Sequence, residues 1–320
     1  MHIPFTTLDV FTSTRYLGNP LAIIRPPTPN SLSQIQKLQI AKEFNLSEVV
    51  FLHLPREETT DPKSNPKEIK IDIFTTDAEI PFAGHPTIGT AFYIRNYLGL
   101  KSVEALITKA GRIPLSFPDN NGKGKTTTAQ IPHNIHIHTT THPFKDFTTG
   151  HETQCPIISI VNGMSFILVH LSSLEDLERV QEFGNLNRDS YYTGLLDEGW
   201  GSGLCCTMYF VGVGKEGGRE MFRTRMFAGM EDPGTGSASC ALACWLGLRG
   251  VGGEGKGVGT VEGNGNGGLE KRFGFVQGVE MGRRNDIFVD VRMRSDGGAV
   301  EEVLLSGEAV KVMEGTLETF

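Results

Sequence analysis

Two short stretches decide how this chain folds: HPTIGTA at residues 85–91 and DPGTGSA at residues 232–238. Aligned without a gap, they share a proline, a glycine, a hydroxyl-bearing residue and an alanine at equal offsets. Uncharged segments run through residues 87–94 and 237–248. A helix that is apolar on every face belongs inside a protein, and about three turns are too few to cross a membrane. The pattern predicts two central helices, each enclosed by a curved sheet.

The segments that precede these two helices follow one order: a strand pair, a helix, two strands and the central helix. In the first half they fall at residues 5–24, 32–41, 49–52, 71–74 and 88–98. In the second half they fall at residues 157–171, 172–180, 206–211, 223–227 and 237–248. Capping-box spacing at Ser31 and Gln34, and at Ser172 and Glu175, is typical of a helix start. The repeat predicts an α+β fold of two similar half-domains, residues 1–135 and 136–306.

The composition argues against several classes of protein. A net charge of -7 and a pI near 5.8 disfavour a nucleic-acid binder, which usually carries a basic face. No apolar run reaches the roughly 20 residues of a membrane span, and the N-terminus lacks the pattern of a signal peptide. The cysteines are odd in number, which disfavours a disulfide framework and favours buried thiols in a reducing cytoplasm. They are Cys155, Cys205, Cys206, Cys240 and Cys244.

The loops before the two central helices are candidate binding sites. Each places backbone N–H groups at a helix N-terminus, where partial positive charge favours anions. Gly84 and Gly236 let a ligand approach the backbone closely. His85 and Asp232 occupy equivalent positions in the gapless alignment, so both could hold a polar substrate. The alternative is ordinary capping, with Asp232 as the N-cap residue before a proline.

Glu48 is a candidate proton acceptor. It stands between the end of a helix and the apolar run at residues 49–52. A carboxylate among apolar neighbours has a raised pKa, which makes it a better base near neutral pH. The alternative is an exposed glutamate at the start of a strand.

The remaining motifs indicate neither a metal nor a cofactor. His136 and His138 alternate with isoleucines on one face of an expected strand, but no Cys or acidic residue near them in sequence has ligand spacing. The glycine-rich stretch 250–268 is expected to be a loop, because it lacks the context and ending of a P-loop. Residues 200–203 do not have the spacing of a nucleophilic serine elbow.

The motifs taken together resemble one known family, the PhzF-like proteins of phenazine biosynthesis. They are GNP (18–20), NLSE (45–48), EIPFAGHPT (79–87), EDPGTGS (231–237), GVEMGR (278–283) and SGEAV (306–310). The resemblance extends from about residue 5 to residue 317. It implies a fold similar to diaminopimelate epimerase, with residues 307–320 returning to the first half-domain.

The resemblance also implies an activity. It identifies Glu48 as the catalytic acid–base residue, supported by His85, Asp232 and Ser237, with Gly84 and Gly236 beside the substrate. The expected function is cofactor-independent transfer of a proton within a small carboxylate-bearing metabolite, as in trans-2,3-dihydro-3-hydroxyanthranilate isomerase. A homodimer is expected. The alternatives are an epimerase or other rearrangement catalyst of secondary metabolism, and a non-catalytic binding protein.

The sequence departs from the family pattern at a few positions. Val49 and Val50 stand where two threonines are common, and Gly234 stands where alanine is common. Epimerases of the wider superfamily use two cysteines at the helix entrances. Here His85 and Asp232 occupy the aligned positions, which disfavours a two-thiol mechanism.

Overall fold

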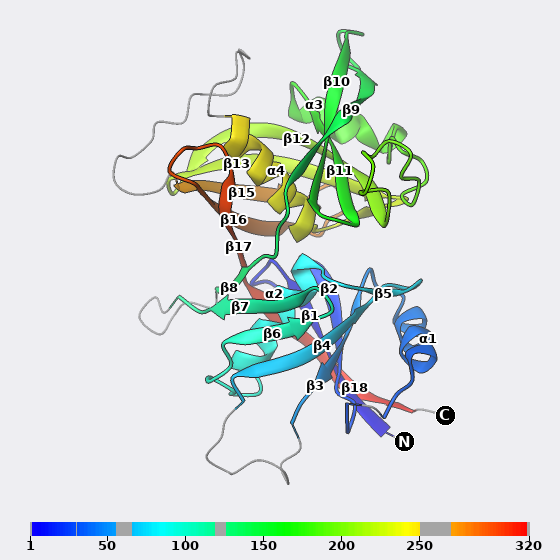
Figure 1. Cartoon of the computed structure of the whole chain (residues 1–320). Coiled ribbons are helices and arrows are strands. Elements are labelled where there is room, and N and C mark those ends of the chain that lie inside the picture. Colours follow the sequence, from blue (N-terminus) through cyan, green and yellow to red (C-terminus); the bar gives the residue numbers. More distant parts are fainter. Residues whose placement is uncertain (1, 30, 56–65, 119–125, 250–269, 319–320) are drawn as a thin grey trace. The chain divides into compact units, whose positions relative to one another are not determined.

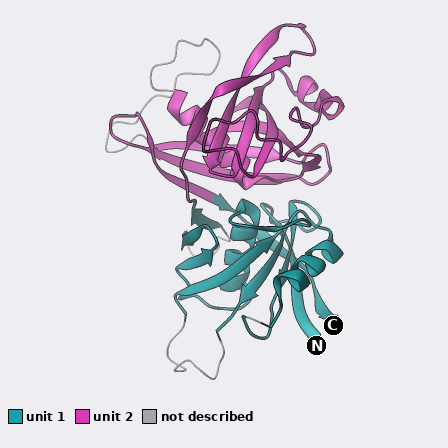
Figure 2. Ribbon diagram, turned by 45° about the vertical axis from the view of Figure 1, so that its right-hand side comes forward, with its two compact units in different colours: residues 1–131, 306–320 teal, residues 132–305 magenta. Residues whose placement is uncertain are grey.

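The computed structural model describes residues 2–29, 31–55, 66–118, 126–249 and 270–318. The glycine-rich stretch 250–268 lies outside these residues. The chain forms two compact units, which Figure 2 shows in separate colours. The first unit comprises residues 1–131 and 306–320, and the second comprises residues 132–305.

The first unit is a sheet with two helices. Its elements are β1 (His2–Val10), β2 (Asn19–Ile24), α1 (Gln34–Phe44), β3 (Val49–His53), β4 (Glu68–Phe74), β5 (Glu79–Ile80), α2 (Gly84–Asn96), β6 (Ala105–Thr108), β7 (Gly111–Ser116), β8 (Thr127–Gln130) and β18 (Ala309–Glu318). The last strand of the chain, β18, pairs antiparallel with β1, so both ends of the chain belong to one sheet (Figure 1).

The second unit repeats this plan. Its elements are β9 (His136–Lys145), β10 (Glu152–Val161), β11 (Met164–His170), α3 (Leu174–Arg179), the 3₁₀ turn η1 (Val180–Glu182), β12 (Leu204–Glu216), β13 (Arg219–Ala228), β14 (Met230–Asp232), α4 (Gly236–Arg249), β15 (Glu270–Gln277), β16 (Asn285–Met293) and β17 (Val300–Gly307). Asn162 and Gly163 form the tight turn that joins β10 to β11, with Val161 opposite Met164.

The strand pairings match between the two units. In the first, β2–β3 and β4–β6 are parallel, whereas β3–β4 and β6–β7 are antiparallel. In the second, β11–β12 and β13–β15 are parallel, whereas β12–β13 and β15–β16 are antiparallel. The matching pairings confirm an α+β fold of two similar halves.

Each sheet curves around its central helix (Figure 1). Helix α2 contacts β1, β2, β3, β8 and β18, and α4 contacts β10, β11, β15 and β16. Every residue of α2 from Gly84 to Ile94 is buried, as is every residue of α4 from Gly236 to Gly247. The uncharged composition of these helices follows from this position, because no helix face reaches water.

A second apolar layer lies on the other face of each sheet. In the first unit, Ile40 and Ala41 of α1 pack with Val49, Phe51 and other strand residues. In the second unit, Leu177 of α3 and Val180 pack in the same cluster as residues of β10, β11 and β12. The sheets are therefore buried on both faces over much of their area, which explains their long apolar runs.

The caps of the outer helices differ by one or two residues from the sequence prediction. Ser33, not Ser31, caps α1: its hydroxyl accepts from Gln36 N, and the Gln36 side chain accepts from Ser33 N. Ser31 instead donates its hydroxyl proton to the carbonyl of Thr28 in the preceding turn. Ser173, not Ser172, caps α3. Neighbouring serines compete for one cap, and backbone geometry decides between them.

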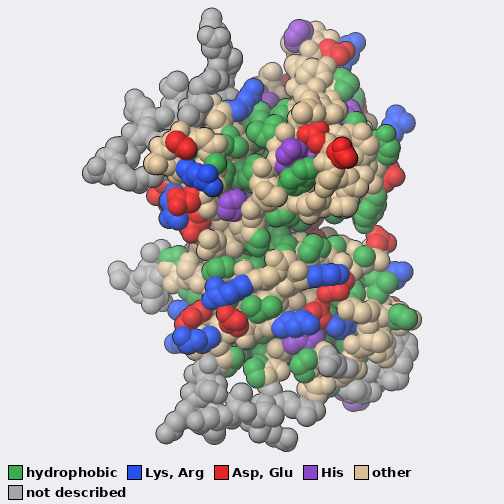
Figure 3. Space-filling view, in the orientation of Figure 1, with side chains coloured by type: hydrophobic (Ala, Val, Ile, Leu, Met, Phe, Trp, Pro, Cys, Tyr) green, Lys and Arg blue, Asp and Glu red, His purple; other side chains and the backbone are tan. Residues whose placement is uncertain are grey.

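The surface carries charges of both signs side by side (Figure 3). In the first unit, Arg112 pairs with Glu68 at 2.7 Å, and Lys67 pairs with Glu104 at 3.3 Å. The mixed surface adds nothing in favour of a nucleic-acid partner. Among the described residues, no helix is long and apolar enough to cross a bilayer.

Candidate active site

Glu48 and His85 come together in the first unit. Asn45 ends α1 in the left-handed conformation, with φ 50°, and the chain then turns into β3. This turn places Glu48 directly before β3, beside the first turn of α2, which carries His85. The Oε2 atom of Glu48 is 3.6 Å from Nε2 of His85. That distance is longer than a hydrogen bond. Glu48 remains partly open to solvent, with a side chain 18% exposed.

His85 is a neutral histidine. Its side chain is buried, and burial lowers the pKa of the imidazole from 6.5 to about 3. The contact with Glu48 therefore joins a carboxylate to an uncharged ring at neutral pH, and it is not an ion pair. The other ring nitrogen, Nδ1, lies 3.3 Å from Nδ2 of Asn19. Asn19 belongs to the GNP motif, but its contact with His85 spans 66 residues and could not be read from the sequence.

Asp232 ends β14 and is held by its own loop. The hydroxyl of Thr235 donates a short hydrogen bond to Oδ2 of Asp232. Gln277, fully buried, donates to the Asp232 carbonyl at 2.7 Å and accepts from Thr235 N at 3.1 Å. Ser237 follows in the first turn of α4 and is 4% exposed. The loop from Asp232 to Gly236 is thus fixed at both its side chains and its backbone.

The equivalence of His85 and Asp232 is wrong by five residues, because the helix starts match Gly84 with Gly236. Helix α2 begins at Gly84, so His85 is helical, whereas Asp232 precedes the start of α4 at Gly236 by four residues. With the helices superposed, His85 matches Ser237.

Side-chain bonds support the corrected register. Thr87 donates its hydroxyl proton to Ala83 O at 2.8 Å, and Ser239 donates to Thr235 O at 3.0 Å, each four residues back along the chain. The corrected register also brings Glu79 opposite Glu231 and Pro81 opposite Pro233. The Asp232-Pro233 dipeptide has the sequence pattern of a helix start. Here Asp232 ends β14 instead, and Pro233 lies in the turn before α4.

The first turns of α2 and α4 remain candidate anion sites. The first N–H groups of a helix have no partner inside it. Gly84, His85, Gly236 and Ser237 all lie in these turns and are buried, so a bound anion would meet backbone N–H groups in low dielectric.

The cysteines are free and buried, as the sequence indicates. Burial raises the pKa of Cys155 and Cys205 to about 11, and that of Cys206 to about 12. A thiol with such a pKa is protonated near neutral pH and is a poor nucleophile. None of the five occupies the first turn of either central helix.

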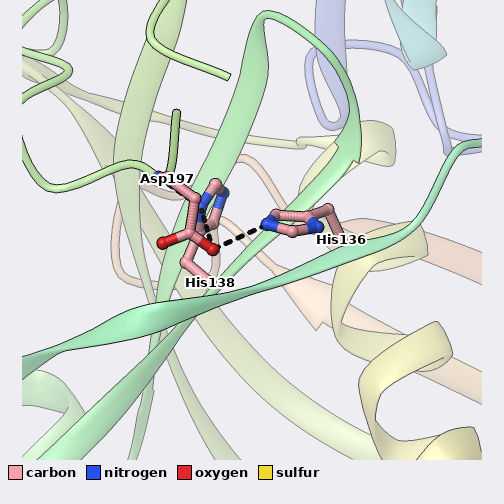
Figure 4. Close-up of side chains that lie close together, drawn as sticks. All are labelled: His136, His138 and Asp197. Atoms are coloured by element: carbon pink, nitrogen blue, oxygen red, sulfur yellow. Dashed lines mark hydrogen bonds and ion pairs between the residues drawn. The ribbon is translucent and has the colours of Figure 1, made fainter. Parts of the chain in front are cut away.

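A second polar cluster joins His136, His138 and Asp197 in the second unit (Figure 4). Nε2 of His136 is 2.8 Å from Oδ2 of Asp197. His138 accepts from Asp197 N at 3.0 Å through Nδ1, and its Nε2 is 2.8 Å from the hydroxyl of Ser159. Sequence reasoning missed Asp197 because it lies 59 residues from His138.

The atoms of this cluster that could bind a metal already make hydrogen bonds within the protein. The Asp197 carboxylate also accepts from the hydroxyl of Thr139 at 2.7 Å, and these bonds lower its pKa to about 2. His136 stacks on Trp200 with centroids 4.5 Å apart. A metal bound by His138 Nδ1 would have to displace the N–H of Asp197. The geometry favours a structural role, in which these hydrogen bonds hold the loop that precedes β12 against strand β9.

Comparisons with known proteins agree with the fold. The sequence profile of the family described as "Phenazine biosynthesis-like protein" matches residues 8–315. An uncharacterized isomerase of Pasteurella multocida is 32% identical over 239 residues, which cover 73% of this chain and 74% of that protein. Trans-2,3-dihydro-3-hydroxyanthranilate isomerase of Pseudomonas chlororaphis is 27% identical over 322 residues, which cover 98% of each chain.

A solved structure shows the same architecture. The PhzF-family phenazine biosynthesis protein of Bacillus anthracis has 18% identity and a TM-score of 0.69, with all of both chains covered. The family profile spans nearly the whole chain, and its relatives are named as isomerases. The chain therefore belongs to the phenazine biosynthesis-like protein family and is a PhzF-type isomerase.

Proposed function

We propose that the protein moves a proton within a small carboxylate-bearing metabolite, and that Glu48 accepts and returns this proton. The observation that carries the proposal is the placement of the Glu48 carboxylate 3.6 Å from the buried ring of His85. In such a reaction Glu48 takes a proton from one carbon of the substrate and gives it to another. The carboxylate is regenerated, so the cycle needs no added cofactor.

The neutral state of His85 supports a basic role for Glu48. A cationic imidazole at this distance would stabilise the carboxylate and weaken it as a base. A neutral imidazole avoids this effect and still offers a hydrogen bond. His85 can therefore orient Glu48 or a polar group of the substrate without removing the basicity that proton transfer requires.

Asp232 and Ser237 have binding roles in this proposal. Asp232 presents a carboxylate fixed by Thr235, which suits an amino or hydroxyl donor of the substrate. Ser237 and Gly236 lie in the first turn of α4, where an anion is favoured. We assign anionic groups of the substrate to helix N-terminal N–H groups within each unit: near Gly84 and His85 in the first, and near Gly236 and Ser237 in the second.

A proton shuttle based on Glu48 fits better than a two-thiol epimerase. The first turns of α2 and α4 carry His85 and Ser237, and the buried cysteines lie elsewhere. A non-catalytic binding protein would keep the anion site but would not exchange protons with its ligand. The two classes are therefore separable by isotope exchange.

The test uses trans-2,3-dihydro-3-hydroxyanthranilate, the compound named for the relative from Pseudomonas chlororaphis, as the probe. The protein is incubated with it in deuterium oxide, and mass spectrometry follows deuterium incorporation. Glu48→Gln keeps the side-chain size but replaces the basic carboxylate with an amide that cannot take up the proton. We expect turnover to fall by at least about 10²-fold, because a general base contributes roughly 10²–10⁴-fold. Calorimetry should show probe affinity within a few-fold of the parent.

Glu43→Gln is the matched control, because Glu43 is an exposed glutamate of the neighbouring helix α1. It should keep full turnover. Activity of Glu48→Gln within a few-fold of the parent would refute the role of Glu48. Binding of the probe without deuterium incorporation by the parent would favour the binding-protein alternative for this compound.

Two further parts of the proposal concern assembly and location. We propose that the protein is a homodimer, as the family resemblance implies, and that it works in a reducing cytoplasm, as its free cysteines suggest. Sedimentation equilibrium should give a mass twice that of one chain, which is 35.0 kDa. A monomer at micromolar concentration would contradict the dimer.

A further inference from the structure

Asn19 makes a contact that bears on the chemistry of His85. It is the first residue of β2, it is fully buried, and its Nδ2 lies 3.3 Å from Nδ1 of His85. An amide nitrogen only donates, so Nδ1 must be the accepting nitrogen of the ring. The proton of the neutral imidazole then belongs to Nε2, which is the nitrogen 3.6 Å from Oε2 of Glu48.

The position of this proton decides how His85 meets Glu48. With the proton on Nε2, the ring presents an N–H to the carboxylate. With the proton on Nδ1, the ring would present a lone pair to a negative oxygen, and the two would repel each other. Protonating both nitrogens would remove the repulsion, but it would place a charge on a ring that is 3% exposed. Nε2 has no hydrogen-bond partner within the described residues, so its proton is available to a substrate.

The backbone holds Asn19 firmly in place. Gly18 has φ +71°, and a Cβ at this residue would lie 2.3 Å from the carbonyl oxygen of Val10. Asn19 pairs with Val10 across β1 and β2. Tyr16, with φ 70°, donates its N–H to Oδ2 of Asp9 at 2.6 Å. A turn with such demands adopts few other conformations, so the Asn19 amide is presented to His85 in one position.

We infer that Asn19 is a positioning residue that fixes His85 with its proton on Nε2, so that His85 acts as a hydrogen-bond donor beside Glu48. Asn19 acts through His85 and transfers no proton itself. The catalytic consequence rests on the proposed function of Glu48 and His85. The position of the histidine proton does not, and it can be measured without a substrate.

The test is nitrogen-15 NMR of the full chain labelled in its histidine rings. The chemical shifts and proton couplings of the two ring nitrogens identify which one carries the proton. His85→Gln assigns the signals by their loss. In the parent protein, His85 should show the proton on Nε2 and should not titrate between about pH 8 and about pH 5, because burial disfavours the charged ring.

Asn19→Asp replaces the donating amide with an accepting carboxylate of the same shape. The proton should move to Nδ1, or His85 should become doubly protonated within the same pH range. Asn185→Asp is the control. Asn185 is also buried, but its side chain bonds the hydroxyls of Ser190 and Thr207 and does not contact His85. It should leave the His85 signals unchanged.

A parent protein with the proton on Nδ1 would overturn the inference, and so would an Asn19→Asp variant with an unchanged His85. If Asn19→Asp fails to fold, the measurement on the parent still decides, because a proton on Nδ1 in the parent would by itself overturn the inference. With an active probe, kcat of Asn19→Asp should fall about 10²–10⁴-fold, as expected when a histidine has the wrong tautomer. Failure of the Glu48→Gln test would leave the tautomer result standing, so the two proposals fail separately.

Discussion

Arg225 donates two hydrogen bonds to Glu231, one residue before Asp232. Nε reaches Oε1 at 2.7 Å and NH2 reaches Oε2 at 2.8 Å, and the two side chains are only 2% and 13% exposed. The third guanidinium nitrogen donates to the carbonyls of Leu177 and Glu178 at 3.1 and 2.9 Å. One buried arginine thus ties the end of β13 both to α3 and to the strand that carries Asp232.

Glu231→Gln should destabilise the second unit and disturb Asp232. Removing one partner of a buried, hydrogen-bonded ion pair leaves the other charge unbalanced, which costs about 3–5 kcal/mol. Urea unfolding measures the loss, and calorimetry with the probe should show weaker binding. Arg112→Gln breaks the exposed pair with Glu68 and should cost less than about 1 kcal/mol. Equal losses in the two variants would contradict the importance of burial.

The stability of the protein should depend on pH through His85. The unfolded ring has a pKa near 6.5, whereas burial lowers the folded pKa to about 3. Between these values the unfolded state binds one more proton than the folded state. The contribution of His85 to the free energy of unfolding should therefore be complete and constant above about pH 6.5. Below that pH, the free energy of unfolding should fall by up to about 1.4 kcal/mol per pH unit.

The measurement compares urea unfolding of the parent and of His85→Gln from about pH 7.5 to about pH 4. Glutamine does not titrate, so the stability advantage of the parent over the variant should shrink as the pH falls. A constant difference across this range would show that His85 keeps an ordinary pKa in the folded protein.

Gly234→Ala should be destabilising in this chain, although alanine fits the pattern of the family. A Cβ at residue 234 would lie 2.2 Å from Oδ1 of Asn285. Asn285 is held by its own bonds to the carbonyls of Pro233 and Arg283 at 2.6 and 2.7 Å, so it cannot easily move. Overpacking of this kind costs about 1–3 kcal/mol.

A double-mutant cycle with Asn285→Ser isolates this contact. Serine removes the obstructing amide, so the cost of Gly234→Ala should be at least about 1 kcal/mol smaller in the Asn285→Ser background. Additive effects in urea unfolding would mean that the close approach of residues 234 and 285 does not limit the loop.

The cluster of His136, His138 and Asp197 should stabilise the second unit through its hydrogen bonds and should not bind a metal. Asp197→Asn weakens the acceptor that binds His136 and Thr139, so the thermal midpoint should fall. Equimolar zinc should leave the midpoint of the parent unchanged, because His138 Nδ1 already accepts from Asp197 N. Stabilisation by zinc that disappears in Asp197→Asn would contradict this assignment and establish a metal site.

The sequence by itself determined the α+β class, the duplication and the two buried helices. Local sequence patterns indicate these features. The patterns are the uncharged helical segments at residues 87–94 and 237–248, an Asn-Gly hairpin turn, and an order of strands and helices that occurs twice. The family motifs added Glu48, His85, Asp232 and Ser237 as candidates. Local patterns are informative here because an uncharged helix that is too short to cross a membrane is stable only in a protein interior.

Tertiary structure decided the contacts that give these residues their chemistry. Asn19 meets His85 across 66 residues, and Asp197 meets His138 across 59. The true register of the two halves pairs His85 with Ser237, which a gapless alignment of Asp-Pro with His-Pro concealed. A sequence lists which groups could donate, accept or titrate. Which nitrogen of a buried histidine carries its proton depends on the one neighbour that the folded backbone brings within about 3 Å.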